Sequence, residues 1–223
     1  MTVMASIEFV TLDVADPTPA SRFYTAALGL DTQVRLRASE AAPTTGFRGF
    51  TLSLIVSQPA TVNGLIDAAL DVGATALKPA AKSLWGYGGV VQASDGTIVT
   101  VASSAKKDTG PATRKIDEFV LQLGVSDVAA SRRFYADRGF AVTKSYGRKY
   151  VEFAATPSPV KLSLYKRRAL AKVAGVSPDG AGSRRLTIGS DAGPFTDPDG
   201  FVWEAASSRS PASIQTTTHL TGS

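Results

Sequence analysis

Two stretches of this chain decide its fold: "FVTLDVADPTPASRFYTAALGL" at residues 9–30 and "VLQLGVSDVAASRRFYADRGF" at residues 120–140. Asp16 matches Asp127 at an offset of 111 residues, and the Phe-Tyr pair inside each stretch matches at the same offset. Both stretches begin with alternating apolar residues, which predicts a half-buried strand, and both continue into a helix. The sequence therefore predicts an internal repeat whose unit opens as strand–helix–strand.

The limits of the two helices can be read from the same stretches. Asp16 can cap the first helix, and Pro17 occupies the first helical position, where its missing N–H costs nothing. Gly29 and Gly139 fall where the helices should end, because glycine readily takes the left-handed conformation that follows a helix.

A second similarity closes each repeat. The segment "VVQASDGTIVTVAS" (90–103) resembles "PFTDPDGFVWEAAS" (194–207), and each has Asp-Gly at its centre. Asp-Gly between apolar runs predicts a β-hairpin. The offset here is 104 residues, so the second copy has lost a net seven residues.

The two repeats differ between these landmarks. The first has apolar residues at helical spacing over 59–74, and the second lacks a helix at the matching place. The second has an extra strand pair instead, at 149–155 and 160–168. We expect a first domain at 1–105, a linker at 106–113, a second domain at 114–207 and a flexible tail at 208–223. The only histidine, His219, lies in that tail and is expected to be solvated.

The composition is that of a soluble globular protein, with 43% hydrophobic and 19% charged residues. No apolar run is long enough for a membrane helix, and the first residues do not form a signal peptide. The chain has no cysteine, which excludes disulfides, thiolate metal sites and cysteine nucleophiles. We expect a cytoplasmic location and no membrane partner.

The net charge of +5 is concentrated in the second repeat. Residues 1–113 hold 8 Lys and Arg against 9 Asp and Glu, whereas residues 114–207 hold 15 against 10. This excess indicates either a solvated basic surface or attraction of an anionic small ligand. Nucleic acid is not an expected partner, because the basic groups are scattered and no aromatic-rich or zinc motif accompanies them.

With these motifs the sequence resembles the glyoxalase/bleomycin-resistance/extradiol-dioxygenase superfamily, whose members are also called vicinal oxygen chelate proteins. The opening stretch and "FTDPDGFVWEAA" are similar to the superfamily's opening and closing signatures, and the resemblance covers residues 5–206. It implies an α+β fold of tandem βαβββ modules with curved mixed sheets, and a pseudo-twofold relation between the two repeats. The first repeat looks shortened in the strands of its opening module, and the second in the helix of its closing module.

The resemblance also implies where metal ligands would stand. Enzymes of this superfamily hold a divalent metal with histidines and carboxylates on strands of paired modules. The matching positions in this sequence are Phe9, Thr51, Thr100, Val120, Ser163, Arg185 and Glu204. Only Glu204 could coordinate a cation, so we expect neither a metal nor a cofactor. The interpretation of Glu204 that assumes no functional role is a carboxylate that lies beside Arg or Lys in a sheet.

The first functional hypothesis is a metal-independent protein that binds a small aromatic or anionic molecule in a sheet-lined cavity. Strand alternation places Tyr150 and Glu152 on one face, with Val151 and Phe153 on the other. The candidate ligand-binding residues are Phe9, Arg37, Arg48, Trp85, Tyr87, Tyr150, Glu152, Tyr165, Arg185 and Glu204. Trp85 and Tyr87 flank the glycine-rich "GYGG" (86–89), which is more typical of a tight loop than of a phosphate cradle.

The alternative is a lyase, isomerase or dioxygenase with an atypical divalent-metal site, which would need Asp13, Glu152 and Glu204 to converge. Whether the protein is an enzyme stays open at this point, and no catalytic residue is assigned. A third possibility is that the second repeat is only a structural partner for the first. The fused repeats favour a monomer with pseudo-dimeric halves, although unpaired sheet edges could also produce a homodimer.

Overall fold

The computed structural model describes residues 4–40, 44–155 and 158–206. The predicted tail at 208–223 and His219 lie outside the described residues.

The first repeat folds into two units. The opening unit consists of β1 (Ile7–Val14), α1 (Pro17–Ser21), the π-helical η1 (Arg22–Ala27), β2 (Val34–Ala38) and the short β3 (Thr45–Gly46). The second unit is a complete strand–helix–three-strand module. It consists of β4 (Phe50–Ile55), α2 (Pro59–Asp71), β5 (Thr75–Ser83), β6 (Gly86–Gln92) and β7 (Ile98–Ser103).

The second repeat also folds into two units, joined by a helix. The third unit is again complete, with β8 (Glu118–Val125), α3 (Val128–Ala136), β9 (Val142–Ser145), β10 (Tyr150–Phe153) and β11 (Lys161–Lys166). The connecting helix is α4 (Arg167–Ala174). The last unit consists of β12 (Gly180–Ala181), β13 (Leu186–Ser190), β14 (Phe195–Thr196) and β15 (Val202–Ala205), with no helix among its described residues.

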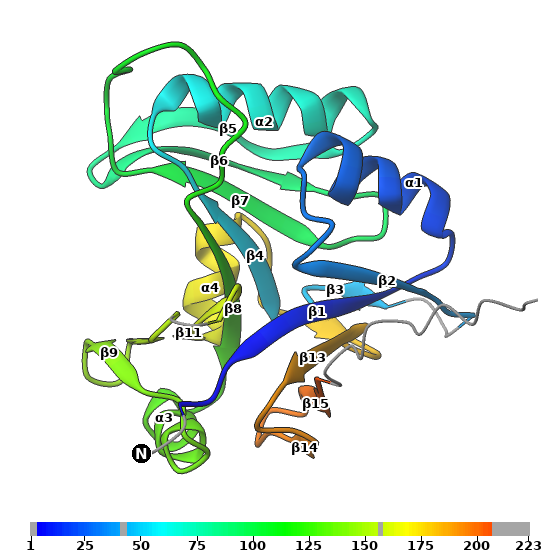
Figure 1. Cartoon of the computed structure of the whole chain (residues 1–223), viewed down its shortest axis with the longest axis vertical. Helices are drawn as coiled ribbons and strands as arrows, with labels where there is room; N and C mark the ends of the chain where they lie inside the picture. Colours follow the sequence, from blue (N-terminus) through cyan, green and yellow to red (C-terminus); the bar gives the residue numbers. More distant parts are fainter. Residues whose placement is uncertain (1–3, 41–43, 156–157, 207–223) are drawn as a thin grey trace, which may run out of the picture.

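Each larger sheet combines one unit from each repeat (Figure 1). The eight-stranded sheet has the order β5-β6-β7-β4-β8-β11-β10-β9, so β4 of the first repeat pairs with β8 of the second. The five-stranded sheet has the order β14-β15-β13-β1-β2, where β1 pairs with β13. A two-stranded sheet of β3 and β12 also joins the repeats. This α+β arrangement of mixed sheets confirms the predicted fold class.

The two shortenings fall in the same sheet. The opening unit contributes only β1 and β2 to the five-stranded sheet, and the last unit contributes three strands without a helix. The eight-stranded sheet receives both complete modules. Its helices α2 and α3 cover one face, with α2 over β5–β7 and α3 against β10 and β11 (Figure 1).

The opening and closing signatures of each repeat are in contact. Tyr24 in η1 donates its hydroxyl to Asp95 in the turn between β6 and β7, at 2.9 Å. Tyr135 in α3 donates to Asp197 in the turn between β14 and β15, at 2.5 Å. These hydrogen bonds join the Phe-Tyr motif of each repeat to its closing hairpin. In the second repeat the acceptor is Asp197, two residues before the Asp-Gly pair.

The predicted helix limits are confirmed. The Asp16 carboxylate accepts from Thr18 N at 2.8 Å, and Pro17 begins α1. Gly29 and Gly139 have φ values of +69° and +93°, as the ends of helices require. The sequence reading missed α4, whose first residues were assigned to the end of the preceding strand. Among the described residues no helix is long and apolar enough to cross a membrane.

Candidate ligand-binding cleft

The eight-stranded sheet has one face turned away from α2 and α3, and α4 covers part of it. Leu170, Ala171 and Ala174 of α4 are fully buried there against Val90 and Ile98. Next to α4, this face carries a cleft of about 660 Å³. Its walls are the hairpin of β5 and β6, the centre of the sheet and the end of α4. Pockets of this size accommodate small organic molecules.

The floor of the cleft is polar at its centre. Side chains of one face alternate along each strand, and the register brings neighbours together across strands. Thr51 lies opposite Gln122, which lies beside Ser163, and Ser53 lies between Val120 and Thr100. The Thr51 hydroxyl donates to Gln122 Oε1 at 2.8 Å. Ser53, Thr100 and Gln122 line the cleft directly.

These floor residues include four of the seven positions at which the resemblance implies metal ligands. Thr51, Thr100, Val120 and Ser163 come from β4, β7, β8 and β11, the four central strands of one sheet. They offer hydroxyls and an isopropyl group, whereas protein sites for divalent metals are built mainly from imidazole, thiolate and carboxylate groups, with carbonyl oxygens for calcium and magnesium. The residues present therefore do not fit a metal. In the described ranges no group of three or more His, Cys, Asp and Glu side chains could hold one.

A charged network lies on the same face at β10 and β11. Tyr150 donates its hydroxyl to Glu152 at 2.6 Å, as the predicted alternation requires, and Lys161 pairs with Glu152 at 2.7 Å. Burial opposes ionisation of Glu152, but hydrogen bonds from Lys161 and Tyr150 outweigh it and lower the pKa of Glu152. Burial, together with the hydrogen bond to Glu152, raises the pKa of Tyr150 far above its ordinary value.

Tyr165 connects this network to the cleft. Its ring packs edge-on against Tyr150, with centroids 4.8 Å apart, and it also lines the cleft. Burial, then the nearby Glu152 charge, raise the pKa of Tyr165, so its phenol stays protonated. Tyr150, Glu152 and Tyr165 are therefore three predicted site residues that the fold brings together.

Trp85 and Tyr87 border the cleft in different ways. Trp85 sits in the turn between β5 and β6 and is 85% exposed. Tyr87 donates its hydroxyl to Asn63 in α2 at 2.9 Å, so its ring packs on the α2 side of the sheet. Of the two, Trp85 has the ring that is free to meet a ligand at the cleft mouth.

Three other predicted residues belong to the five-stranded sheet. Phe9 is 4% exposed, and the Arg35 guanidinium lies 3.2 Å from its ring centroid. Arg37 pairs with Asp13 at 2.6 Å. Glu204 is the acceptor of a long hydrogen bond from Thr11, at 3.5 Å. The hydrogen bond to Asp13 raises the pKa of Arg37, and the charge of Glu204 adds to this effect. Glu204 thus lies in a sheet near an arginine, as expected if it has no role in binding a ligand.

Arg48 and Arg185 lie outside the cleft. Arg48 is buried, donates to the Thr97 hydroxyl and lies 3.9 Å from Asp95. Burial lowers its pKa, and Arg185 lowers it further. Arg185 is also buried and has a φ of +51° at the start of β13. Both arginines stand near the junction of the two repeats.

The sequence reading missed the residues that form much of the cleft. Ser53 and Gln122 were not singled out, although each is a polar residue at an alternating position in an otherwise apolar strand. That pattern could have indicated an inward polar face. The other missed lining residues, such as Lys78, Lys82 and Val173, come from elements that meet only in three dimensions.

Comparisons with known proteins give the fold. No family model matches the sequence, and no curated protein matches it. Glyoxalase I from Zea mays is similar in structure, with a TM-score of 0.57, 15% identity, and coverage of 89% of this chain and 91% of that chain. A putative dioxygenase from Bacillus subtilis has a TM-score of 0.53, 11% identity, and coverage of 83% and 69%. At these identities the similarity shows that this chain has the glyoxalase/dioxygenase fold.

Proposed function

We propose that this protein, which has the fold of glyoxalase I, is a metal-independent binding protein for a small aromatic or anionic molecule. The ligand would lie in the cleft between α4 and the β5–β6 hairpin. Fold alone does not assign a function, so the proposal depends on the residues of the site.

One observation carries the proposal: the sheet centre is polar but uncharged, while the surrounding walls are mainly apolar and include two lysines, Lys78 and Lys82. Ser53, Thr100 and Gln122 can exchange hydrogen bonds with a ligand, and Val90 and Val173 offer apolar contact. A few polar groups in an apolar pocket are typical of small-molecule sites. Lys82 also lines the cleft, next to the exposed Trp85, and would attract a negative substituent.

The enzyme alternative lacks the geometry that it requires. Glu152 lies in β10 of the eight-stranded sheet, whereas Asp13 and Glu204 lie in β1 and β15 of the five-stranded sheet. Glu152 thus belongs to a different sheet from Asp13 and Glu204, and the three do not form a cluster that could hold a metal among the described residues. We therefore propose binding without a metal-dependent reaction.

Binding can be tested with 1-anilinonaphthalene-8-sulfonate, an aromatic anion, by isothermal titration calorimetry. Ala102 is half-buried and lines the cleft, so Ala102→Trp should fill it and weaken binding by about tenfold or more. Ala205→Trp, at an exposed position in β15, is the matched control and should bind as the original protein does. Equal affinities for all three proteins would contradict the proposal.

Metal independence needs its own measurement. Elemental analysis of protein purified without chelator should find Mn, Fe, Zn and Mg well below one equivalent per chain. EDTA should leave the melting temperature unchanged, because metal that binds the folded state would stabilise it. A stoichiometric metal, lost together with thermal stability on chelation, would restore the enzyme hypothesis.

A further inference from the structure

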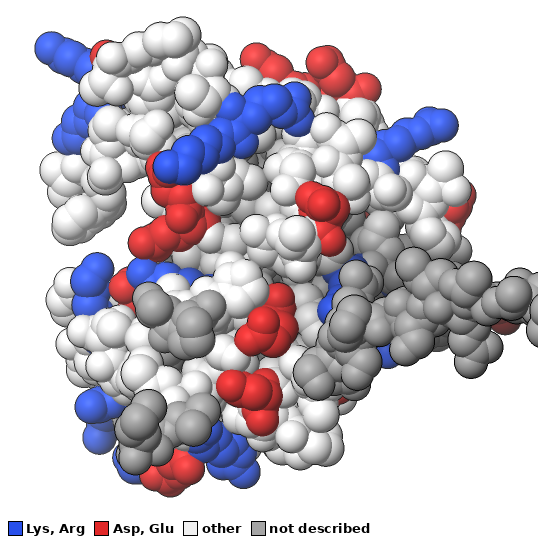
Figure 2. Space-filling view, viewed as in Figure 1, with Lys and Arg blue, Asp and Glu red and all other residues white. Residues whose placement is uncertain are grey.

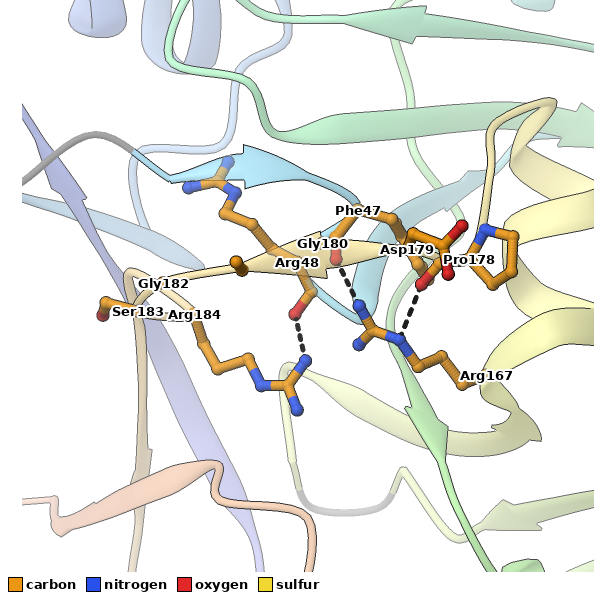
Figure 3. A pocket seen from close by; sticks show the side chains of 10 residues that line it. Phe47, Arg48, Arg167, Pro178, Asp179, Gly180, Gly182, Ser183 and Arg184 are labelled. Atoms are coloured by element: carbon orange, nitrogen blue, oxygen red, sulfur yellow. Dashed lines mark hydrogen bonds between the residues drawn. The ribbon is translucent and has the colours of Figure 1, made fainter.

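A second hollow, of about 450 Å³, lies at the other end of α4 from the cleft. Arg167, the first residue of α4, lines this hollow, whereas Val173 near the end of α4 lines the cleft. Its remaining walls are Phe47, Arg48, the segment from Pro178 to Ser183 that includes β12, and Arg184 (Figure 3).

Two guanidinium groups converge in this hollow from different segments. Figure 3 shows Arg167 and Arg184 reaching toward each other beneath the strands β3 and β12. The Nη1 atoms of both arginines lie 2.4 Å from the position that a Cβ of Gly49 would occupy. A side chain at residue 49 would have to displace both groups, so Gly49 leaves room for this close approach of two like charges. Arg48, in contrast, turns its guanidinium away from the hollow (Figure 3).

Neutral groups hold both arginines in place. Arg167 donates to the carbonyls of Pro178 and Phe47. Arg184 donates to the carbonyls of Arg48 and Asp199, at 2.8 and 3.0 Å. Within the described part of the chain, neither guanidinium lies within ion-pair distance of a carboxylate. Arg167 Nη1 is buried and has no hydrogen-bond partner.

The two carboxylates whose charges act on Arg167, Asp179 and Asp199, are hydrogen-bonded to serines. Asp199 accepts hydrogen bonds from Ser126 N, Ser126 Oγ and Ser131 Oγ. Asp179 accepts from Ser177 Oγ at 2.9 Å. Burial, and after it the charge of Arg184, lower the pKa of Arg167, while the two carboxylates oppose this only in part. Asp179 also lines the hollow, but neither guanidinium has a direct ion-pair partner among the described residues.

We propose that this hollow is a binding site for a phosphoryl group, held between Arg167 and Arg184. Two guanidinium groups that arrive from opposite sides suit a tetrahedral oxyanion, whose several oxygens can each accept a charged hydrogen bond. A carboxylate has only two oxygens, so it would accept fewer charged hydrogen bonds from the two guanidinium groups than a phosphoryl group does. The open volume beyond the arginines leaves room for an organic group on the phosphate. Inorganic phosphate and phosphate monoesters share this chemistry.

The inference is tested by isothermal titration calorimetry with inorganic phosphate, phenyl phosphate and acetate, at an ionic strength held constant with NaCl. We expect saturable binding of phosphate to the intact chain. Arg167→Gln and Arg184→Gln should each weaken it by about tenfold or more, because a charge-assisted hydrogen bond is lost. Arg168→Gln is the matched control, since Arg168 is exposed and faces the neighbouring surface; it should bind within about twofold of the original affinity.

Each outcome decides the proposal. Tighter binding of phenyl phosphate than of phosphate would identify an organic monoester as the ligand class, and equal binding would identify the free anion. Absence of saturable phosphate binding, equal loss in all three variants, or acetate bound as tightly as phosphate would overturn the proposal. If a glutamine variant unfolds, Arg167→Lys and Arg184→Lys keep the charge and test the forked geometry. Phosphate titration of the intact chain by NMR should then shift the amide signals of residues 180–184, and unshifted signals would overturn the site.

Discussion

Two tyrosine–aspartate pairs fasten the helix of each repeat to its closing hairpin. Tyr135 is fully buried, and its acceptor Asp197 also takes hydrogen bonds from the backbone N–H groups of Asp199 and Phe201. Tyr24 and Asp95 form the corresponding pair in the first repeat. A single side-chain contact thus holds together segments that are about 60 to 70 residues apart in sequence.

Removing one of these hydroxyls should destabilise the protein without emptying the core. Tyr135→Phe leaves the Asp197 carboxylate buried with one partner fewer, which costs about 1–3 kcal/mol of unfolding free energy. Tyr146→Phe removes a hydroxyl from a side chain that is 65% exposed and should cost almost nothing. Urea unfolding of both variants measures the difference, and equal midpoints would contradict this role of the pair.

Glu152 gives a pH-dependent test at the same scale. Its pKa is lowered in the folded state, so the ionised carboxylate contributes stability above the unfolded pKa of about 4.3, and that contribution is lost as the pH falls through the folded pKa. Glu152→Gln should therefore cost about 2 kcal/mol at pH 7 and much less near pH 3. Unfolding curves at both pH values provide the comparison.

Glu118→Gln is the control for that measurement, because Glu118 pairs with the same lysine, Lys161, at 3.1 Å. The Glu118 side chain is 47% exposed, and exposed ion pairs contribute little. If the two variants lose the same free energy of unfolding at both pH values, the burial of Glu152 does not contribute to stability in the way proposed.

At the scale of elements, a lysine from strand β5 binds the carboxyl end of helix α4. Lys78 in β5 donates to the carbonyls of Lys172 and Val173 at the end of α4, at 2.8 and 2.7 Å. Gly175 ends the helix with φ +80°, and a Cβ there would lie 2.7 Å from Lys78 Cε. The helix that borders the cleft is thus fixed by one cation at its carboxyl end, where the helix dipole favours positive charge.

Gly175→Ala should loosen this end of α4. The substitution strains a left-handed backbone by about 1–2 kcal/mol and also displaces Lys78 from its two carbonyls. Gly29→Ala is the matched control, since Gly29 has φ +69° with open space around it and should show only the strain. Hydrogen exchange of the α4 amides should accelerate in Gly175→Ala alone; unchanged exchange would show that Lys78 does not hold the helix.

Local patterns predicted most of these elements and missed what depends on distant pairing. The hairpins, α2 and the strand pair of β10 and β11 follow from turn residues and periodicity, which act over a few residues. The helix α4 was missed because its short apolar run directly continues a strand, and such runs are ambiguous from periodicity alone. The network of Tyr150 and Glu152 was predictable from alternation. Arg167 and Arg184 converge from separate segments, so their spacing in the sequence does not predict that they lie close together.

At the scale of the whole molecule, neither repeat forms a sheet by itself, because every sheet contains strands of both repeats. The pairings of β4 with β8 and of β1 with β13 cross from one repeat to the other. Acidic and basic side chains are interspersed on the face shown in Figure 2, so that face has no continuous basic surface. Both repeats contribute to the main core, which contains Leu52 and Leu54 together with Leu121 and Leu123.

The protein should therefore unfold as one unit. Differential scanning calorimetry should give a single transition whose calorimetric and van't Hoff enthalpies agree. Residues 1–105 and 114–223, produced separately, should aggregate or remain unfolded, because each exposes the long strands that normally pair with the other. Two separate transitions, or a stable monomeric half, would contradict this coupling.

The location of the two shortenings also bears on how such a chain changes over generations. Each sheet draws one unit from each repeat, so the opening of one copy and the end of the other can erode together while the remaining pair stays complete. This arrangement leaves one sheet complete when the other is shortened. Natural selection could then act on the cleft of the intact sheet while its counterpart accumulates deletions.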